Sequence, residues 1–139
     1  MKLKKTSITN YRCFKEAEID FDEHTTLIVG KNGAGKTAIL DAVAVAISTF
    51  LLGIDGGVSR SISKDDARYE FYDLDGTVDP QHQFPVSIES TGDCLDNHDV
   101  KWVRSLNSES GNTTVKEARE LTNISKNTQK RIMTGDKSL

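Results

Sequence analysis

A phosphate-binding pattern occupies residues 30–37, where Gly30 is followed by four residues and then by Gly35, Lys36 and Thr37. This spacing matches G-x-x-x-x-G-K-[ST], in which glycines let backbone N–H groups turn inward around a polyphosphate. We expect Lys36 to reach the β and γ phosphates and the Thr37 hydroxyl to bind Mg²⁺, so the pattern predicts binding of ATP with Mg²⁺. The predicted contacts from this segment are Gly30, Lys31, Asn32, Gly33, Ala34, Gly35, Lys36, Thr37 and Ala38.

Two apolar elements should position this loop. Residues 25–30, "TTLIVG", contain the continuous run Leu27 to Val29, which is typical of a strand covered on both faces. Residues 37–52 are nearly all apolar, and Gly53 stands where a helix C-terminus would place it, so we predict a buried helix. The N-terminus of such a helix attracts anions, because its dipole and its unpaired N–H groups both point there.

The residues around the loop resemble a known group of proteins. The segment "GKNGAGKTAILDAV" looks like the Walker A loop of the ABC-type ATPase heads in SMC and RecF recombination and repair proteins, and "LKKTSITNYRCFKEAEIDF" is similar to their opening strand pair. The resemblance implies that Asn10 to Arg12 lie close to the nucleotide, and it adds Arg12 to the predicted contacts. The chain is also similar to the N-terminal part of bacterial AAA-family ATPases that include PtuA-like antiphage-defence proteins, which work beside an HNH nuclease.

The resemblance further implies motifs that this sequence lacks. Hydrolysis in such heads needs a Walker B strand ending in Asp-Glu and a Leu-Ser-Gly-Gly loop, yet the only Asp-Glu pair, at residues 22–23, ends an alternating strand. No catalytic residue can be named, and the context of Gln81, Gln83 and Gln129 selects none as a metal-binding glutamine. We therefore expect the N-terminal lobe of a longer ATPase, completed by a C-terminal lobe or a second protomer, with nucleotide binding without hydrolysis as the alternative.

The expected fold is an α/β P-loop NTPase lobe like an ABC or SMC head, with a mixed β-sheet, an antiparallel hairpin annex and a C-terminal helix. Residues 1–57 should hold strands, the phosphate loop and the buried helix. Residues 58–83 are acidic and punctuated by glycine, so we expect a loop with little regular structure. Residues 84–107 predict a β-hairpin, and residues 114–133 predict a helix that begins with a capping box of Thr114 and Glu117.

Composition narrows the partners. The net charge of -3 is not that of a nucleic-acid-binding domain, and the mild basic excess of the tail favours a solvated helix face over DNA contact, which stays open. Cys13 and Cys94 form no disulfide framework, and residues 1–9 are too polar for a signal peptide, so we expect a cytoplasmic protein. The longest apolar run, residues 42–52, is far shorter than the roughly 20 residues of a membrane span.

Two other patterns compete with the phosphate loop. "DLDGTVD" at residues 73–79 spells the first motif of haloacid dehalogenase-like phosphatases, with Asp73 as nucleophile, but the preceding residues alternate with charge, and an acidic turn closed by Gly76 is favoured. Cys94, His98 and His82 suggest half of a zinc site, yet no second ligand pair follows at the required spacing. Trp102 lies in a predicted strand, where packing is favoured over base stacking.

Overall fold

The computed structural model describes residues 1–21 and 34–135. Four strands form one sheet in the order β2-β1-β5-β6, made of β1 (Lys2–Tyr11), β2 (Phe14–Asp20), β5 (Val86–Cys94) and β6 (Asn97–Leu106). Every pairing in this sheet is antiparallel. The predicted strand at residues 25–30 lies outside the described residues.

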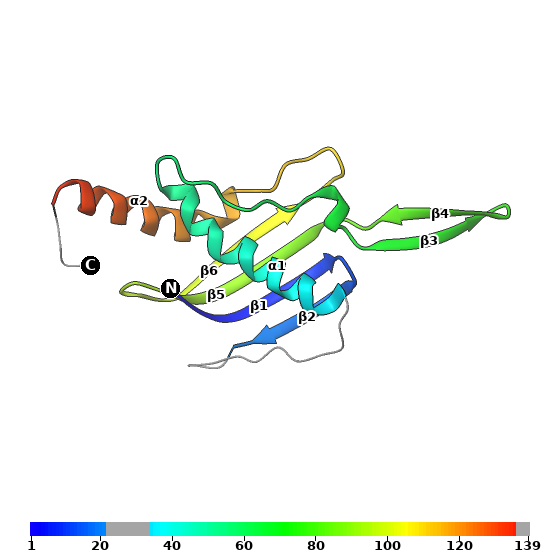
Figure 1. The fold of residues 1–139 in the computed structure, drawn as a ribbon, viewed down its shortest axis with the longest axis horizontal. Helices are drawn as coiled ribbons and strands as arrows, with labels where there is room; N and C mark the ends of the chain where they lie inside the picture. Colours follow the sequence, from blue (N-terminus) through cyan, green and yellow to red (C-terminus); the bar gives the residue numbers. More distant parts are fainter. Residues whose placement is uncertain (22–33, 136–139) are drawn as a thin grey trace.

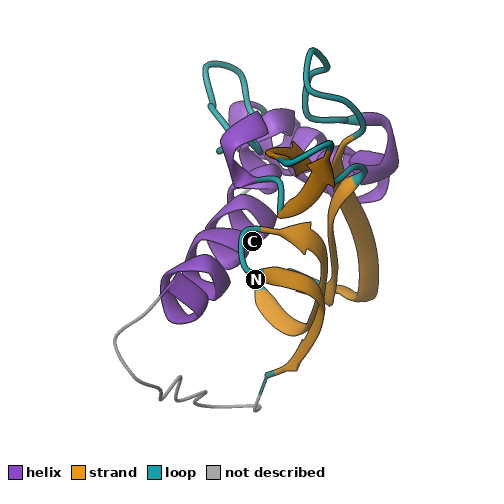
Figure 2. Cartoon of the chain, turned by 90° about the vertical axis from the view of Figure 1, so that its right-hand side faces the viewer, coloured by secondary structure: helices purple, strands orange, loops and turns teal. Residues whose placement is uncertain are grey.

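Helices cover one face of this sheet (Figures 1 and 2). Helix α1 (Ala34–Ser48) crosses the strands and continues into a short 3-10 helix, η1 (Thr49–Gly53). Its small side chains are fully buried against the sheet, together with apolar residues of β1 and β5, because alternate residues of each strand point to that face. The buried helix residues are Ala38, Ala42, Val45 and Ala46.

A second buried cluster joins the other end of the sheet to helix α2 (Arg119–Met133), which follows the short η3 (Lys116–Ala118). Trp102 of β6 lies at its centre, 1% exposed, and donates a hydrogen bond from Nε1 to the carbonyl oxygen of Ala46 at 3.0 Å. The predicted packing role of Trp102 is confirmed. Leu121 of α2 is fully buried in the same cluster.

The α/β class, the antiparallel hairpin and the C-terminal helix are confirmed. The hairpin of β5 and β6 is, however, continuous with the opening strands, because β5 pairs with β1 along Ile8↔Ile88 and neighbouring residues. It is thus one half of the four-stranded sheet, with β6 at the edge, and no separate annex. The predicted capping box is not formed: the Thr114 hydroxyl accepts a hydrogen bond from the Ser105 N–H at 3.0 Å, and the residue that precedes α2 is Ala118.

The segment 58–83 differs from its prediction as a loop. It contains a short 3-10 turn, η2 (Lys64–Asp66), and the antiparallel pair β3 (Tyr69–Leu74) and β4 (Thr77–His82), which projects from the rest of the molecule (Figure 1). Asp75 and Gly76 connect the two strands, and both have positive φ, as a two-residue type I′ turn requires. The residues of β3 alternate between aromatic and acidic types, which argues against a strand buried on both faces. The same alternation is typical of an exposed strand such as β3.

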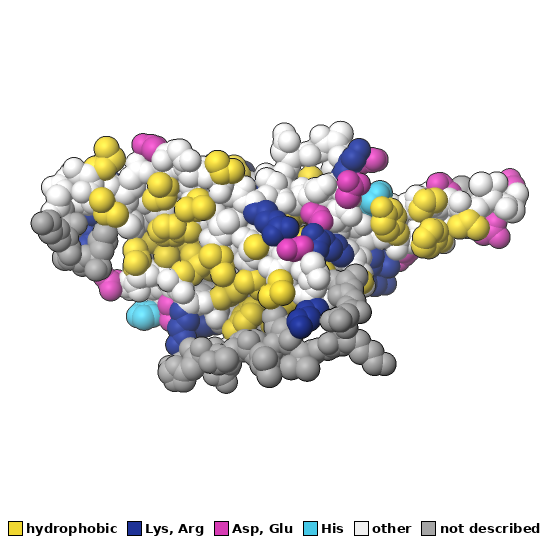
Figure 3. All heavy atoms as spheres, viewed as in Figure 1, with side chains coloured by type: hydrophobic (Ala, Val, Ile, Leu, Met, Phe, Trp, Pro, Cys, Tyr) yellow, Lys and Arg dark blue, Asp and Glu magenta, His cyan; other side chains and the backbone are white. Residues whose placement is uncertain are grey.

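Helix α1 is less buried than its composition predicted. By length and composition Gly35–Gly53 could span a membrane, with a mean hydropathy of 1.6, but the buried core helix of a globular domain meets the same criterion. One side of α1 packs on the sheet, whereas Leu40 and Ile47 on its other side, and Leu51 of η1, are exposed. Hydrophobic side chains accordingly gather over this helix on the surface (Figure 3).

Candidate functional site

The described part of the phosphate loop is the first turn of α1. Ala34, Gly35, Lys36 and Thr37 are helical, and the side chains of Lys36 and Thr37 are exposed to solvent. The first turn of any helix has N–H groups without helical partners, which is why anions bind there. Gly30, Lys31, Asn32 and Gly33 lie outside the described residues. Ala38 is fully buried and its side chain belongs to the core.

The turn between β1 and β2 lies against the start of α1. A Cβ atom added to Gly35 would stand 3.5 Å from the Phe14 ring and 3.7 Å from the sulfur of Cys13, which is ordinary van der Waals contact. Arg12 precedes these two residues and has a positive φ of 54° in the tight turn between β1 and β2. The fold therefore brings Arg12, predicted from the family resemblance, to the same end of α1 as Lys36 and Thr37.

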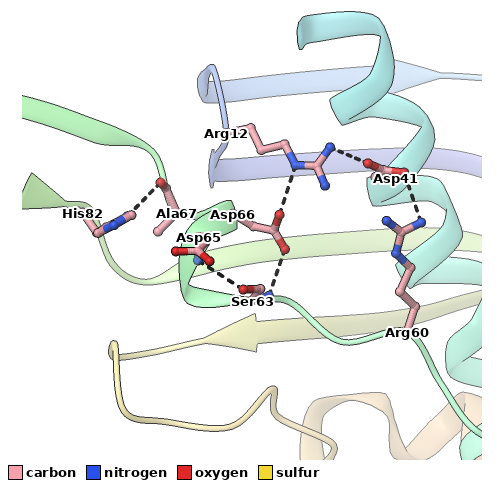
Figure 4. A network of polar contacts seen from close by, with 8 residues as sticks. All are labelled: Arg12, Asp41, Arg60, Ser63, Asp65, Asp66, Ala67 and His82. Atoms are coloured by element: carbon pink, nitrogen blue, oxygen red, sulfur yellow. Dashed lines mark hydrogen bonds and ion pairs between the residues drawn. The ribbon is translucent and has the colours of Figure 1, made fainter.

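Arg12 is held by two carboxylates (Figure 4). Its Nη1 forms an ion pair with Asp41, one helical turn beyond Thr37, and its Nε donates to Asp66 Oδ1 at 3.1 Å. The Arg12 backbone N–H also donates to the Asp66 carbonyl oxygen at 2.6 Å. Arg60 contributes a second cation, with Nη1 3.0 Å from Asp41 Oδ1. This network, which we call the arginine network, consists of Arg12, Asp41, Arg60 and Asp66.

Local structure fixes the orientation of Asp66. It ends η2, where its Oδ2 accepts a hydrogen bond from the Ser63 N–H at 2.8 Å, while the Ser63 hydroxyl accepts from the Asp65 N–H at 3.2 Å. These two bonds form a capping box, which satisfies N–H groups that the short helix leaves free. Because Asp66 is held by η2, its other oxygen can face Arg12 without losing further rotamer freedom.

The arginine network is balanced in charge and lowers the basicity of Asp41. Burial acts to raise the pKa of Asp41, but the hydrogen bond from Arg12 and the charges of Arg12 and Arg60 outweigh it and hold the pKa below its usual value. A carboxylate with a depressed pKa is a poor proton acceptor. Asp41 is therefore suited to positioning the two arginines and unsuited to activating water. Only the family resemblance pointed to Arg12, and no sequence signal selected Arg60 or Asp66.

The other sequence candidates lie away from this site. Asp73 is in the exposed β3–β4 pair, and its carboxylate accepts a hydrogen bond from the Gly76 N–H at 3.1 Å, which is turn geometry. Gln129 lies on α2 and bonds Asp55 at 2.9 Å. Cys94 is buried and its thiol is free, whereas His98 pairs with Asp93. Within residues 1–21 and 34–135, no three His, Cys, Asp or Glu residues group as a metal site.

An apolar helix that carries Gly35, Lys36 and Thr37 in its first turn and packs on a β-sheet is typical of α/β proteins of the P-loop NTPase class. The family model described as "AAA domain" matches residues 5–135, and the chain belongs to this family of P-loop ATPases. Together with the RecF and Rad50 relatives below, this match confirms the predicted recognition of an SMC- and RecF-like ATPase.

Individual relatives share shorter segments. The DNA replication and repair protein RecF of Flavobacterium johnsoniae is 54% identical over 43 residues, which are 31% of this chain and 12% of that protein. The DNA double-strand break repair Rad50 ATPase of Archaeoglobus fulgidus is 48% identical over 44 residues, 32% of this chain and 5% of that protein. RecF of Actinobacillus pleuropneumoniae is 32% identical over 100 residues, 68% of this chain and 26% of that protein. The chain thus spans a small part of the length of these relatives.

Proposed function

We propose that the chain binds the phosphates of ATP at the first turn of α1, with Lys36 as the cation that contacts the β and γ phosphates. The observation that carries this proposal is the position of the β1–β2 turn, which stands against Gly35 beside the exposed Lys36 and Thr37. The loop from Gly30 to Ala38 would supply backbone N–H groups around the polyphosphate. Arg12 would add a second cation from the neighbouring turn.

Magnesium fits the same site. Thr37 presents a hydroxyl in the first helical turn, and Mg²⁺ takes phosphate oxygens, water and a few protein oxygens as ligands. When bound, the ion would neutralise part of the triphosphate charge. Thr37 would orient the phosphate chain through this contact, and Lys36 would hold the phosphate oxygens directly.

The arginine network would limit how strongly Arg12 contributes to ATP binding. Arg12 is paired with Asp41 and Asp66 in the described structure, so a phosphate has to compete with two carboxylates for the guanidinium. Arg12 would therefore contribute less to affinity than Lys36 does. Removing the carboxyl charge of Asp66 should leave Arg12 paired with Asp41 alone and so tighten ATP binding, whereas removing Lys36 should weaken it.

The cellular role that we propose is that of the nucleotide-binding part of an ATPase in DNA repair, because relatives that share the loop are named for that process. Hydrolysis would depend on a C-terminal lobe or a second protomer. Antiphage defence and an HNH nuclease partner rest on the resemblance to PtuA-like proteins. DNA contact through α2 would show as a salt-dependent mobility shift that the double variant Lys130→Glu and Arg131→Glu abolishes.

A titration with a fluorescent ATP analogue tests the proposal. We expect Lys36→Ala to weaken binding about ten- to a hundredfold, because a charge-assisted hydrogen bond contributes roughly 1.5–3 kcal/mol. Lys116→Ala, an exposed lysine of η3, is the matched control and should change affinity less than about twofold. Thr37→Ala should remove the dependence of binding on Mg²⁺.

The exposed thiol of Cys13 gives an independent readout. Its sulfur lies beside Gly35, so bound ATP should slow its reaction with a thiol reagent, and should not do so in Lys36→Ala. Equal affinity of Lys36→Ala and the unchanged protein would refute the proposed site. Measured ATP hydrolysis by this chain alone, lost in Lys36→Ala, would refute our expectation that hydrolysis needs further parts.

A further inference from the structure

The projecting pair β3–β4 has two chemically different faces. In an antiparallel pair, residues directly opposite each other share a face. The register therefore places Tyr69, Phe71, Val78 and Pro80 on one face, with His82 at its base and Asp73 near its tip. We call this face the apolar face of the arm. The other face carries polar pairs such as Glu70↔Gln81 and Tyr72↔Asp79. The arm is thus an amphipathic hairpin with residue bounds Tyr69–His82.

The apolar face lies in solvent. Phe71 is 70% exposed, Val78 62% and Tyr69 48%. Hydrophobic side chains are visible along the arm in the space-filling view (Figure 3). Aromatic packing is found at the base of the arm, where the ring centroid of His82 lies 4.2 Å from that of Tyr69 and 6.4 Å from that of Phe84. A two-stranded hairpin is marginally stable by itself, and contiguous exposed apolar residues mark binding surfaces.

The two edges of the arm differ as well. Within the described residues β3 pairs only with β4, so its outer edge presents backbone groups that no further strand covers. The outer edge of β4 is interrupted by Pro80, which has no N–H to donate. An added strand would therefore fit beside β3.

Charge limits what can occupy that edge. Between residues 69 and 83 the sequence has four acidic residues and no lysine or arginine. The acids are Glu70, Asp73, Asp75 and Asp79, of which Glu70 forms an ion pair with Arg68 at the base of the arm. A nucleic-acid backbone would be repelled, and so would the arm of a second copy. A cationic segment is the complement.

We propose that the arm binds an extended segment of a partner protein whose residues alternate between apolar and basic, paired with the outer edge of β3. The apolar side chains of that segment would cover Phe71 and Tyr69. Its Lys or Arg side chains would lie on the polar face, whose acidic residues are Glu70 and Asp79. Strand addition takes affinity from backbone hydrogen bonds and specificity from alternate side chains. The surface is distinct from the first turn of α1 and needs no nucleotide.

Three synthetic heptapeptides test this proposal against the full chain by fluorescence anisotropy. The probes are an alternating Lys-Val peptide, a Glu-Val peptide of the same pattern, and a peptide of four lysines followed by three valines. We expect the alternating Lys-Val peptide to bind at least about tenfold more tightly than the other two. Amide hydrogen exchange should show new protection in Tyr69–Leu74 and little in Thr77–His82.

Two variants locate the binding surface. Phe71→Thr should weaken binding of the alternating Lys-Val peptide at least about fivefold, because it removes most of the apolar contact. Met133→Thr, at a residue 76% exposed at the end of α2, is the matched control and should leave affinity unchanged. Asp79→Lys should reduce the preference for Lys-Val over Glu-Val. Thermal melting checks that each variant is folded.

Any of four results would overturn the proposal. The block peptide could bind as tightly as the alternating one, Phe71→Thr could bind normally, or the protected amides could lie outside β3. Self-association that Phe71→Thr abolishes would make a second copy the occupant of the arm.

Discussion

Gly53 is the residue where a single methyl group should report on the docking of α2. It ends η1, and a Cβ atom added there would stand 1.8 Å from Ser125 Oγ, 2.4 Å from the Thr122 carbonyl oxygen and 3.0 Å from the Lys126 nitrogen. The Ser125 side chain can rotate, but the carbonyl oxygen cannot move unless α2 moves. Local propensity points the other way, since alanine stabilises helical backbone by roughly 0.5–1 kcal/mol relative to glycine.

The clash should outweigh the propensity. Forcing a methylene into a packed interface costs about 1–3 kcal/mol, and here two of the three contacts are backbone atoms, so we expect Gly53→Ala to lower the free energy of unfolding by about 1–2 kcal/mol net. Urea denaturation followed by circular dichroism measures this as a lower midpoint at an unchanged slope.

A double-mutant cycle with Ser125→Ala tests the cause. Removing the hydroxyl takes away the nearest atom but leaves the Thr122 carbonyl oxygen, so the cycle should show partial rescue of Gly53→Ala. An unfolding free energy for Gly53→Ala equal to or above that of the unchanged protein would show that η1 and α2 are not packed as described. Complete rescue would show that the backbone contact has no cost.

Three further outcomes follow from single residues. Cys13 should react with a thiol reagent in the folded protein and Cys94 only on unfolding, because Cys94 is buried and burial raises its pKa. The hydrogen bond from the Asp99 N–H, together with contacts from Lys4 and His98, outweighs burial and lowers the pKa of Asp93 to about 2. Its stabilising effect is therefore complete above about pH 4 and lost as the pH falls toward 2, and Asp93→Asn should flatten urea midpoints across that window. Arg104→Met should lower the free energy of unfolding, measured in urea, by roughly 2–4 kcal/mol. The control Arg119→Met, at an exposed arginine, should lower it by less than about 0.5 kcal/mol. Equal effects of the two substitutions would contradict a buried role for Arg104.

The burial of Arg104 could not be predicted from the sequence. In sequence this residue belongs to a mild basic excess in the tail, which favours a solvated surface. In the structure it is 2% exposed and donates hydrogen bonds to the Thr114 carbonyl oxygen, Thr49 and Ser59. These three partners come from different parts of the chain, and no local pattern indicates that they meet. The hydroxyl of Thr114 is occupied by a different contact, the hydrogen bond from the Ser105 N–H, which explains why its local capping signature fails.

Short-range sequence patterns predicted the structure better where it depends on a single helix or strand. The alternation of Ala17 and Ile19 with acidic residues predicts a strand with one half-buried face, and β2 has that pattern. The run of apolar residues after Thr37 predicts a helix, but it does not indicate whether one face or both faces of that helix are covered by other elements. Helix α1 has one face on the sheet and the other exposed, because the four described strands lie on one side of it. In the described residues, composition overstated its burial.

The sequence by itself determined the α/β class and the family, because glycine spacing, a Lys-Thr pair and an apolar helix are local and recognisable without coordinates. The tertiary structure decided what surrounds that motif. Arg12, Asp41 and Asp66 come from a turn, a helix and a short 3-10 helix, and they meet only because the β1–β2 turn and η2 pack beside α1. Ion pairs between distant segments depend on the path of the whole chain, and a one-dimensional pattern carries no record of that path.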